Sequence, residues 1–192
     1  MNKSQILQAI EQTPKSPYAT PRIEGLRDSA VLVILHWYDD EWHILFTKRA
    51  EHLNAHPGQI SFPGGRVEHH DESLEHTAMR ETEEEVGIKR SVLEIEAQLT
   101  TVTTLTGYRI RPYVCFLDEL PELLIDTTEV DVAFSVPLTF LKASENLKTV
   151  KREYQGALFK TFALHWEEHL IWGATAHMVA DLVYRLRQAE NT

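Results

Sequence analysis

The stretch FPGGRVEHHDESLEHTAMRETEEEVGI, from Phe62 to Ile88, decides how the rest of the chain is interpreted. Gly64 and Gly65 form a turn in which the backbone can approach a ligand closely. After a short polar loop, residues 73–86 show the length and the three-and-four spacing that are typical of a helix. Gly87 is placed to end this helix in a left-handed conformation. The stretch therefore predicts a glycine turn, a loop and a helix in series.

Four carboxylates occupy five successive positions near the end of this helix. Glu81, Glu84 and Glu85 are related as i, i+3 and i+4, so they share one helix face. Like charges at this spacing repel, and acidic groups are unfavourable at the negative end of a helix dipole. A charge run of this kind is usually a solvated surface. The glycine turn favours another interpretation, in which a hard cation such as Mg²⁺ or Mn²⁺ offsets the repulsion.

Taken together, these residues resemble the Nudix box. The positions that match this pattern in register are Arg80, Glu81, Glu84, Glu85, Gly87 and Ile88. Six residues lie between Gly65 and Glu72 where the general pattern has five, and Thr82 replaces the usual apolar residue. Glu72 and Asp71 therefore both remain candidates for the acidic residue of the loop, and Asp71 or Ser73 is expected to cap the helix.

The resemblance implies a metal site and a fold. Glu81, Glu84 and Glu85 would bind Mg²⁺ or Mn²⁺, the carbonyl of Gly65 would add a ligand, and Arg80 would pair with a carboxylate to orient it. The implied reaction is hydrolysis of a diphosphate bond. The implied fold is an α/β (α+β) protein, a Nudix-type α/β/α sandwich with a mixed, largely antiparallel sheet and a loop-helix-loop catalytic motif.

A second resemblance narrows the family to coenzyme A diphosphatases. The matching residues are Leu45 to Ala50, Leu53, His56, Gly58 and Phe62 to Gly65. This likeness implies cleavage of coenzyme A or acyl-CoA to 3′,5′-ADP and 4′-phosphopantetheine. Asn54 stands where that subfamily tends to have an arginine, and asparagine cannot grip a phosphate bidentately. Another nucleoside diphosphate derivative, such as ADP-ribose or a dinucleotide, stays an alternative, as does a non-catalytic nucleotide-binding module.

Further candidates lie outside the acidic run. Glu129 would be an additional metal ligand or a base, or simply a surface acid. Lys48 and Arg49, at a strand end, would bind substrate phosphates unless they are only solvated. Phe62 and Tyr108 would stack on an adenine ring unless they serve packing. The backbone at Gly64 and Gly65 would complete the substrate site.

We predict no metal or catalytic site from the histidines or the cysteine. His52, His56, His69 and His70 invite a zinc proposal, but only His52 and His56 have the i, i+4 spacing of a helical ligand pair, and they lie in a probable loop. Cys115 lies in an apolar run and is expected to behave as a small buried hydrophobe.

Composition bounds the remaining possibilities. The 192 residues fit one domain, residues 1–192, in which residues 1–28 form an N-terminal helical arm and connector. A formal charge of −10 argues against a broad nucleic-acid surface. The apolar run Ala30 to Leu35 is too short to cross a bilayer. We therefore expect a cytoplasmic protein with a small nucleotide substrate and no membrane partner, and a homodimer is retained as a candidate state.

The expected elements follow from periodicity and turn residues. Two strands, 29–37 and 41–48, should form a hairpin around Tyr38, Asp39 and Asp40. The other predicted segments are a helix at 1–12, an extended connector at 13–21, strands at 93–102, 109–117 and 131–136, and a last helix at 174–188.

Overall fold

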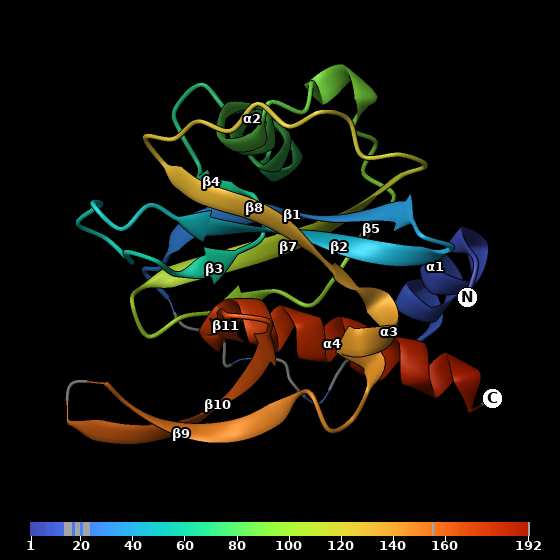
Figure 1. Cartoon of the computed structure of the whole chain (residues 1–192). Helices are drawn as coiled ribbons and strands as arrows, with labels where there is room; N and C mark the ends of the chain where they lie inside the picture. Colours follow the sequence, from blue (N-terminus) through green and yellow to red (C-terminus); the bar gives the residue numbers. More distant parts are fainter. Residues whose placement is uncertain (14–16, 18–19, 21–23, 155, 192) are drawn as a thin grey trace.

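The computed structural model describes residues 1–13, 17, 20, 24–154 and 156–191 (Figure 1). In chain order the elements are α1 (Lys3–Gln12), β1 (Arg27–Tyr38), β2 (Glu41–Arg49), β3 (Ile60–Ser61), β4 (Gly64–Arg66), α2 (Leu74–Val86), a 3-10 turn (Arg90–Val92), β5 (Ala97–Gln98), β6 (Val102–Thr103), β7 (Tyr108–Leu117), β8 (Val130–Pro137), α3 (Leu138–Lys142), β9 (Lys148–Tyr154), β10 (Ala157–Trp166), β11 (His169–Trp172) and α4 (Gly173–Glu190).

A mixed sheet forms the centre of the molecule. Its main path runs β3-β2-β1-β7-β5, while β4 pairs with β1, β6 with β7 and β8 with β2. The β1–β7 pair is parallel, and the other pairings of this sheet are antiparallel. The predicted hairpin is confirmed: Asp39 and Asp40 connect β1 to β2 with φ values of 48° and 60°. Two positive φ values give the turn whose twist matches that of antiparallel strands.

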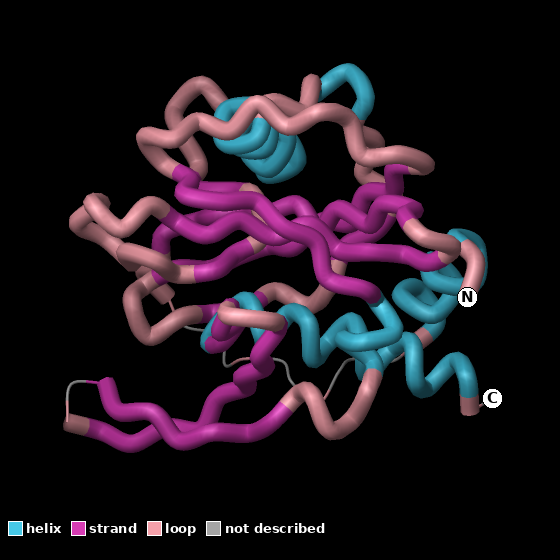
Figure 2. Tube along the Cα trace, in the orientation of Figure 1, coloured by secondary structure: helices cyan, strands magenta, loops and turns pink. Residues whose placement is uncertain are grey.

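Helices cover both faces of this sheet (Figure 2). On β1, Ala30, Leu32 and Ile34 pack in the cluster that includes Ala78 and Val86 of α2. The alternate β1 residues face a larger cluster that includes side chains of α1, α3 and α4. This alternation follows from the two-residue period of a strand. The layered α+β architecture with a mixed sheet is as predicted.

A second, three-stranded sheet was not predicted. It has the order β11-β10-β9 and lies beyond α4, away from α2 (Figure 1). Leu164 and Ile171 of this sheet belong to the core cluster that contains α4. Residues 148–172 carry charged side chains among the apolar ones, and they form strands by pairing with one another and packing against the helix that directly follows.

The predicted strand 93–102 is wrong for most of its length. Only Ala97–Gln98 and Val102–Thr103 pair with β7. Between them, the backbone N–H of Thr100 donates to Asp181 Oδ2 of α4 at 2.9 Å, and its hydroxyl donates to Oδ1 at 3.0 Å. Thr100 therefore turns toward a helix, and the strand is interrupted there.

The helical part of the N-terminal arm is confirmed as α1, which begins after an Asn2 capping box. Within the predicted connector 13–21, residues 14–16, 18–19 and 21 lie outside the described residues. None of the helices in the described part of the chain is both long and apolar enough to cross a membrane.

Candidate active site

The helix that carries the acidic run has clear local causes at both ends. Ser73, rather than Asp71, is its N-cap: the Ser73 hydroxyl accepts from the backbone N–H of His76 at 3.1 Å. Gly87 ends the helix with φ 75°, and its N–H donates to the carbonyl of Glu83 at 3.0 Å. Thr82, which replaces an apolar residue, is fully buried and donates its hydroxyl to the carbonyl of Ala78 at 2.8 Å. The hydroxyl is thus satisfied inside the helix.

Asp71 holds the arginine of this helix. Arg80 Nε donates to Asp71 Oδ1 at 2.9 Å, and Arg80 Nη2 donates to Oδ2 at 3.0 Å. The Asp71 side chain has no solvent exposure and also accepts from the Thr77 hydroxyl and the Glu68 backbone N–H. The Arg80 guanidinium is the main reason that the pKa of Asp71 is lowered far below its usual range. Asp71, and not the exposed Glu72, is therefore the acidic partner in the loop.

Glu81 lies against the backbone of Gly65. A Cβ on residue 65 would stand 2.5 and 2.6 Å from Glu81 Oε1 and Oε2, so only glycine leaves room for this carboxylate. Arg80 Nη2 pairs with Glu81 Oε1 at 2.9 Å. Burial raises the pKa of Glu81, although Arg80 opposes that effect. The predicted orienting role of Arg80 thus has a geometric counterpart.

Glu85 is the most deeply buried carboxylate of the acidic run, with 6% exposure. Its Oε2 accepts from the backbone N–H of Gly64 at 3.3 Å. Burial, followed by the nearby charges of Glu81 and Glu129, raises the pKa of Glu85 to about 8. A buried carboxylate surrounded by like charges requires a proton or a cation.

Glu84 departs from the predicted convergence of the three glutamates. Its side chain is 58% exposed, and its Oε2 accepts from Arg80 Nη1 at 2.7 Å. Among the residues that the structure describes, one group of three His, Cys, Asp or Glu side chains has donor atoms within 4.8 Å of one another, and it does not include these glutamates. Arg80, which lies one helical turn earlier, holds the Glu84 carboxylate, and Glu84 is still near enough to raise the pKa of Glu81.

The carboxylate set nevertheless fits a hard divalent cation. Glu129 lies close enough to raise the pKa of both Glu81 and Glu85, Glu81 raises that of Glu85, and all the donors of these side chains are oxygens. No lysine or arginine of the described chain lies within 4.0 Å of the Glu85 carboxylate. Uncompensated oxygen donors of this kind suit Mg²⁺ or Mn²⁺ better than a softer metal.

The remaining predicted residues surround this carboxylate set unequally. Arg49 Nε donates to the carbonyl of Ala55 at 2.9 Å, and its Nη1 lies 4.0 Å from Glu129 Oε2. Lys48 pairs with Glu51 at 3.0 Å and with Asp131 at 3.1 Å. Arg49 therefore faces the acidic group, whereas Lys48 is already neutralised by two carboxylates.

The Gly65 carbonyl and the Phe62 ring each have a partner within the protein. The carbonyl of Gly65 accepts from the Ser29 hydroxyl at 2.5 Å, a contact between distant strands for which the sequence offers no signal. Phe62 is 1% exposed and stacks on Phe46, with ring centroids 4.9 Å apart. The prediction that Phe62 stacks on adenine is therefore wrong, because neighbouring core side chains already cover its ring.

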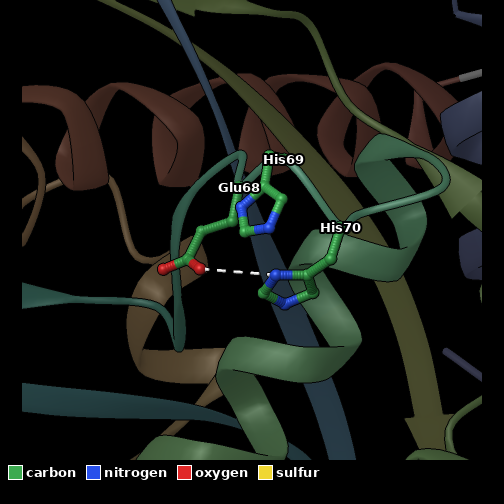
Figure 3. Close-up of side chains that lie close together, drawn as sticks. All are labelled: Glu68, His69 and His70. Atoms are coloured by element: carbon green, nitrogen blue, oxygen red, sulfur yellow. Dashed lines mark ion pairs between the residues drawn. The ribbon is translucent and has the colours of Figure 1, made fainter.

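Histidines gather on the loop before α2. Glu68, His69 and His70 form the group whose donor atoms lie within 4.8 Å of one another (Figure 3). Glu68 Oε2 is 3.6 Å from His70 Nδ1, and all three residues are exposed. His52 and His56 belong to no such group among the described residues, so the structure does not assemble the four histidines into one site.

Known proteins resemble this chain both in sequence and in fold. A family model described as "NUDIX domain" matches residues 26–158. A protein of Enterobacter sp. (strain 638) described as "Uncharacterized Nudix hydrolase NudL" is 33% identical over 162 residues, which cover 83% of each chain. A protein of Yersinia pestis (strain Pestoides F) with the same description is 32% identical over 143 residues, or 74% of this chain and 72% of the relative.

Solved structures are similar in fold. A MutT/nudix family protein from Enterococcus faecalis aligns with a TM-score of 0.55 and 17% identity, over 100% of this chain and 76% of that one. The NUDIX domain of Shewanella oneidensis NrtR, determined with ADP ribose, aligns with a TM-score of 0.50 and 22% identity, over 72% of this chain and 85% of that one.

Proposed function

The chain belongs to the Nudix hydrolase family, and we propose that its substrate is coenzyme A or an acyl-CoA. The family assignment makes it a hydrolase of diphosphate bonds in nucleotide derivatives. The coenzyme A assignment is supported by the second resemblance, over Leu45 to Gly65. Hydrolysis would give 3′,5′-ADP and 4′-phosphopantetheine, or its acylated form.

The observation that carries the proposal is the set of carboxylates beside the glycine turn. Nudix hydrolases generally use a divalent metal, typically Mg²⁺ or Mn²⁺. We assign Glu81, Glu85 and the Gly65 carbonyl as its ligands, together with Glu84 once that side chain leaves Arg80. A bound metal of this kind neutralises phosphate charge and activates water.

We assign a separate role in the reaction to each of the surrounding side chains. Arg80, held by Asp71, orients Glu81. Glu129 is our candidate to accept the proton of the attacking water, because half of its side chain is exposed whereas Glu85 is covered. Arg49 would contact a substrate phosphate, and Lys48 has a lesser claim because two carboxylates already hold it.

A substrate panel tests the reaction. Purified protein with Mg²⁺ or Mn²⁺ should consume coenzyme A faster than ADP-ribose or a dinucleotide, with the products separated by chromatography. Asn54 favours the alternative substrates, since an expected phosphate contact is missing. Preferential cleavage of ADP-ribose would replace the coenzyme A assignment, and no turnover of any diphosphate would favour a nucleotide-binding module.

A matched pair of variants tests the proposed metal ligands. Glu84→Gln removes one negative charge with little change in shape and should lower turnover strongly. Glu83→Gln is the control on the same helix, because Glu83 faces Lys89 and Arg90 instead of the glycine turn. Equal activity of the two variants would refute the assigned role of Glu84. A homodimer and a cytoplasmic location stay predictions.

A further inference from the structure

Two arginines flank the ring of Tyr108. The guanidinium carbon of Arg27 lies 4.2 Å from the ring centroid, and that of Arg66 lies 5.3 Å from it. Contacts of this kind hold a guanidinium in place through the negative face of the ring. The fold therefore brings together three side chains that are far apart in sequence: Arg27 is 81 residues from Tyr108, and Arg66 is 42 residues from it.

Strand register places this arginine pair at the strand ends next to the glycine turn. Arg27 is directly opposite Tyr108 in the β1–β7 pair, and Ser29 is opposite Arg66 in the β1–β4 pair. Residues i and i+2 of a strand share a face, so Arg27, Ser29, Arg66 and Tyr108 lie on one side of the sheet. The Ser29 hydroxyl donates to the carbonyl of Gly65, and Gly65 directly precedes Arg66. Arg66 therefore directly follows an assigned ligand, while its side chain lies on the sheet face opposite the one that α2 covers.

These two guanidiniums lack acidic partners in the described part of the chain. Arg27 donates to the carbonyl of Thr106 at 3.3 Å, and no ion pair involves either Arg27 or Arg66. The neighbouring Arg109 differs, because Asp28 neutralises it through contacts of 2.6 and 2.8 Å. Two exposed, uncompensated arginines in a chain with a net charge of −10 mark a local anion site.

We propose that Arg27 and Arg66 bind a phosphomonoester on the ribose of the substrate, while the diphosphate lies at the glutamates. An arginine fork matches phosphate oxygens bidentately, and this geometry discriminates a phosphorylated ribose from a free one. The inference rests on the proposed function, because coenzyme A carries a phosphomonoester at the 3′ position of its ribose. It makes Arg27 and Arg66 specificity-determining residues for 3′-phosphorylated nucleotides.

A binding experiment tests this inference without turnover. Calorimetry should show that the wild type binds 3′,5′-ADP at least tenfold more tightly than 5′-AMP. Arg27→Gln and Arg66→Gln should each remove most of that difference and leave 5′-AMP binding unchanged. Arg66→Lys, which keeps the charge but not the fork, should retain part of it.

The matched control is Arg152→Gln. Arg152 also lies over an aromatic ring, 5.2 Å from the centroid of Trp172, but it belongs to β9 in the second sheet. This variant should bind both nucleotides as the wild type does. Equal affinity of the wild type for 3′,5′-ADP and 5′-AMP, or an equal loss for both ligands in the Arg27 and Arg66 variants, would overturn the proposal.

Kinetics separate this inference from the proposed function. The wild type should have a higher kcat/KM for coenzyme A than for 3′-dephospho-coenzyme A, and Arg66→Gln should lower only the first value. If neither compound is cleaved while ADP-ribose is, the coenzyme A assignment fails. The preference for 3′,5′-ADP in binding then still decides whether the arginine pair is a phosphomonoester site.

Discussion

Replacing Gly65 with alanine places a methyl group against the Glu81 carboxylate. The new Cβ would stand 2.5 and 2.6 Å from the two carboxylate oxygens, where ordinary contact begins at 3.4 Å. Glu81 must therefore retreat by about 1 Å, and a misplacement of that size costs on the order of 100-fold in rate. This corresponds to about 2.7 kcal/mol in the activation free energy.

The stability of the Gly65→Ala protein should change little. Gly65 does not have a positive φ, so alanine fits the backbone, and the flexible end of Glu81 is what must move. A compatible Gly→Ala change even stabilises by roughly 0.4–1 kcal/mol through the unfolded chain. We expect a strong loss of kcat on diphosphate substrate together with a urea midpoint close to that of the wild type.

Gly64→Ala is the matched control for this prediction. Gly64 has φ 148°, and its added Cβ would lie 2.6 Å from Val31 Cα, with the carbonyl of Ala30 also in the way. Backbone on a neighbouring strand cannot yield as a side chain does, so this variant should lose several kcal/mol of folding stability, of about the size of overpacking. The reasoning is refuted if Gly65→Ala keeps full activity, or if it unfolds as readily as Gly64→Ala.

Three further changes probe the fold around the site. Asp71→Asn should cost roughly 1.5–3 kcal/mol in urea unfolding at pH 7, because Arg80 loses its two bonds to Asp71 but keeps Glu81 and Glu84. Since the folded pKa of Asp71 is lowered, this difference should shrink as pH falls below the ordinary carboxyl range, and a constant difference would contradict the assignment. Asp181→Asn should cost roughly 3–5 kcal/mol in the same measurement by isolating Arg185. Asp181→Leu combined with Arg185→Met should restore part of the stability, since Thr100 still lacks its acceptor, and a double variant no more stable than Asp181→Asn would argue against a buried ion pair. Burial lowers the pKa of His36 from 6.5 to about 4, so the neutral form is favoured in the folded chain, and about 3 kcal/mol of stability should be lost between pH 6.5 and pH 4. His36→Gln should remove that part of the slope in denaturation measured across this range, and an unchanged slope would exclude His36 as its source.

Local sequence predicted the elements that depend on near neighbours. The helix α2, its Gly87 terminus and the hairpin turn at Asp39 and Asp40 each follow from residues within a few positions of one another. The same holds for the shared face of Glu81 and Glu85, because helix geometry places residues four apart on one side. These features needed no knowledge of the rest of the chain.

Residue spacing along the sequence did not predict contacts between residues that lie far apart in the chain. Nothing in the spacing distinguishes Asp71 from Glu72 as the partner of Arg80, and nothing signals that Phe62 is covered by Phe46. The second sheet was missed for another reason: its strands carry charged side chains among the apolar ones and form by pairing with one another and packing against α4. The arginine pair around Tyr108 likewise joins three strands.

The sequence by itself determined the acidic helix, the glycine turn before it and the class of layered fold. Only the tertiary structure decided that Asp71 rather than Glu72 holds Arg80, that Phe46 covers Phe62, and that Arg27 and Arg66 meet at one ring. The physical reason is that helix and turn geometry act over a few residues, whereas burial and charge pairing depend on which distant segments pack together.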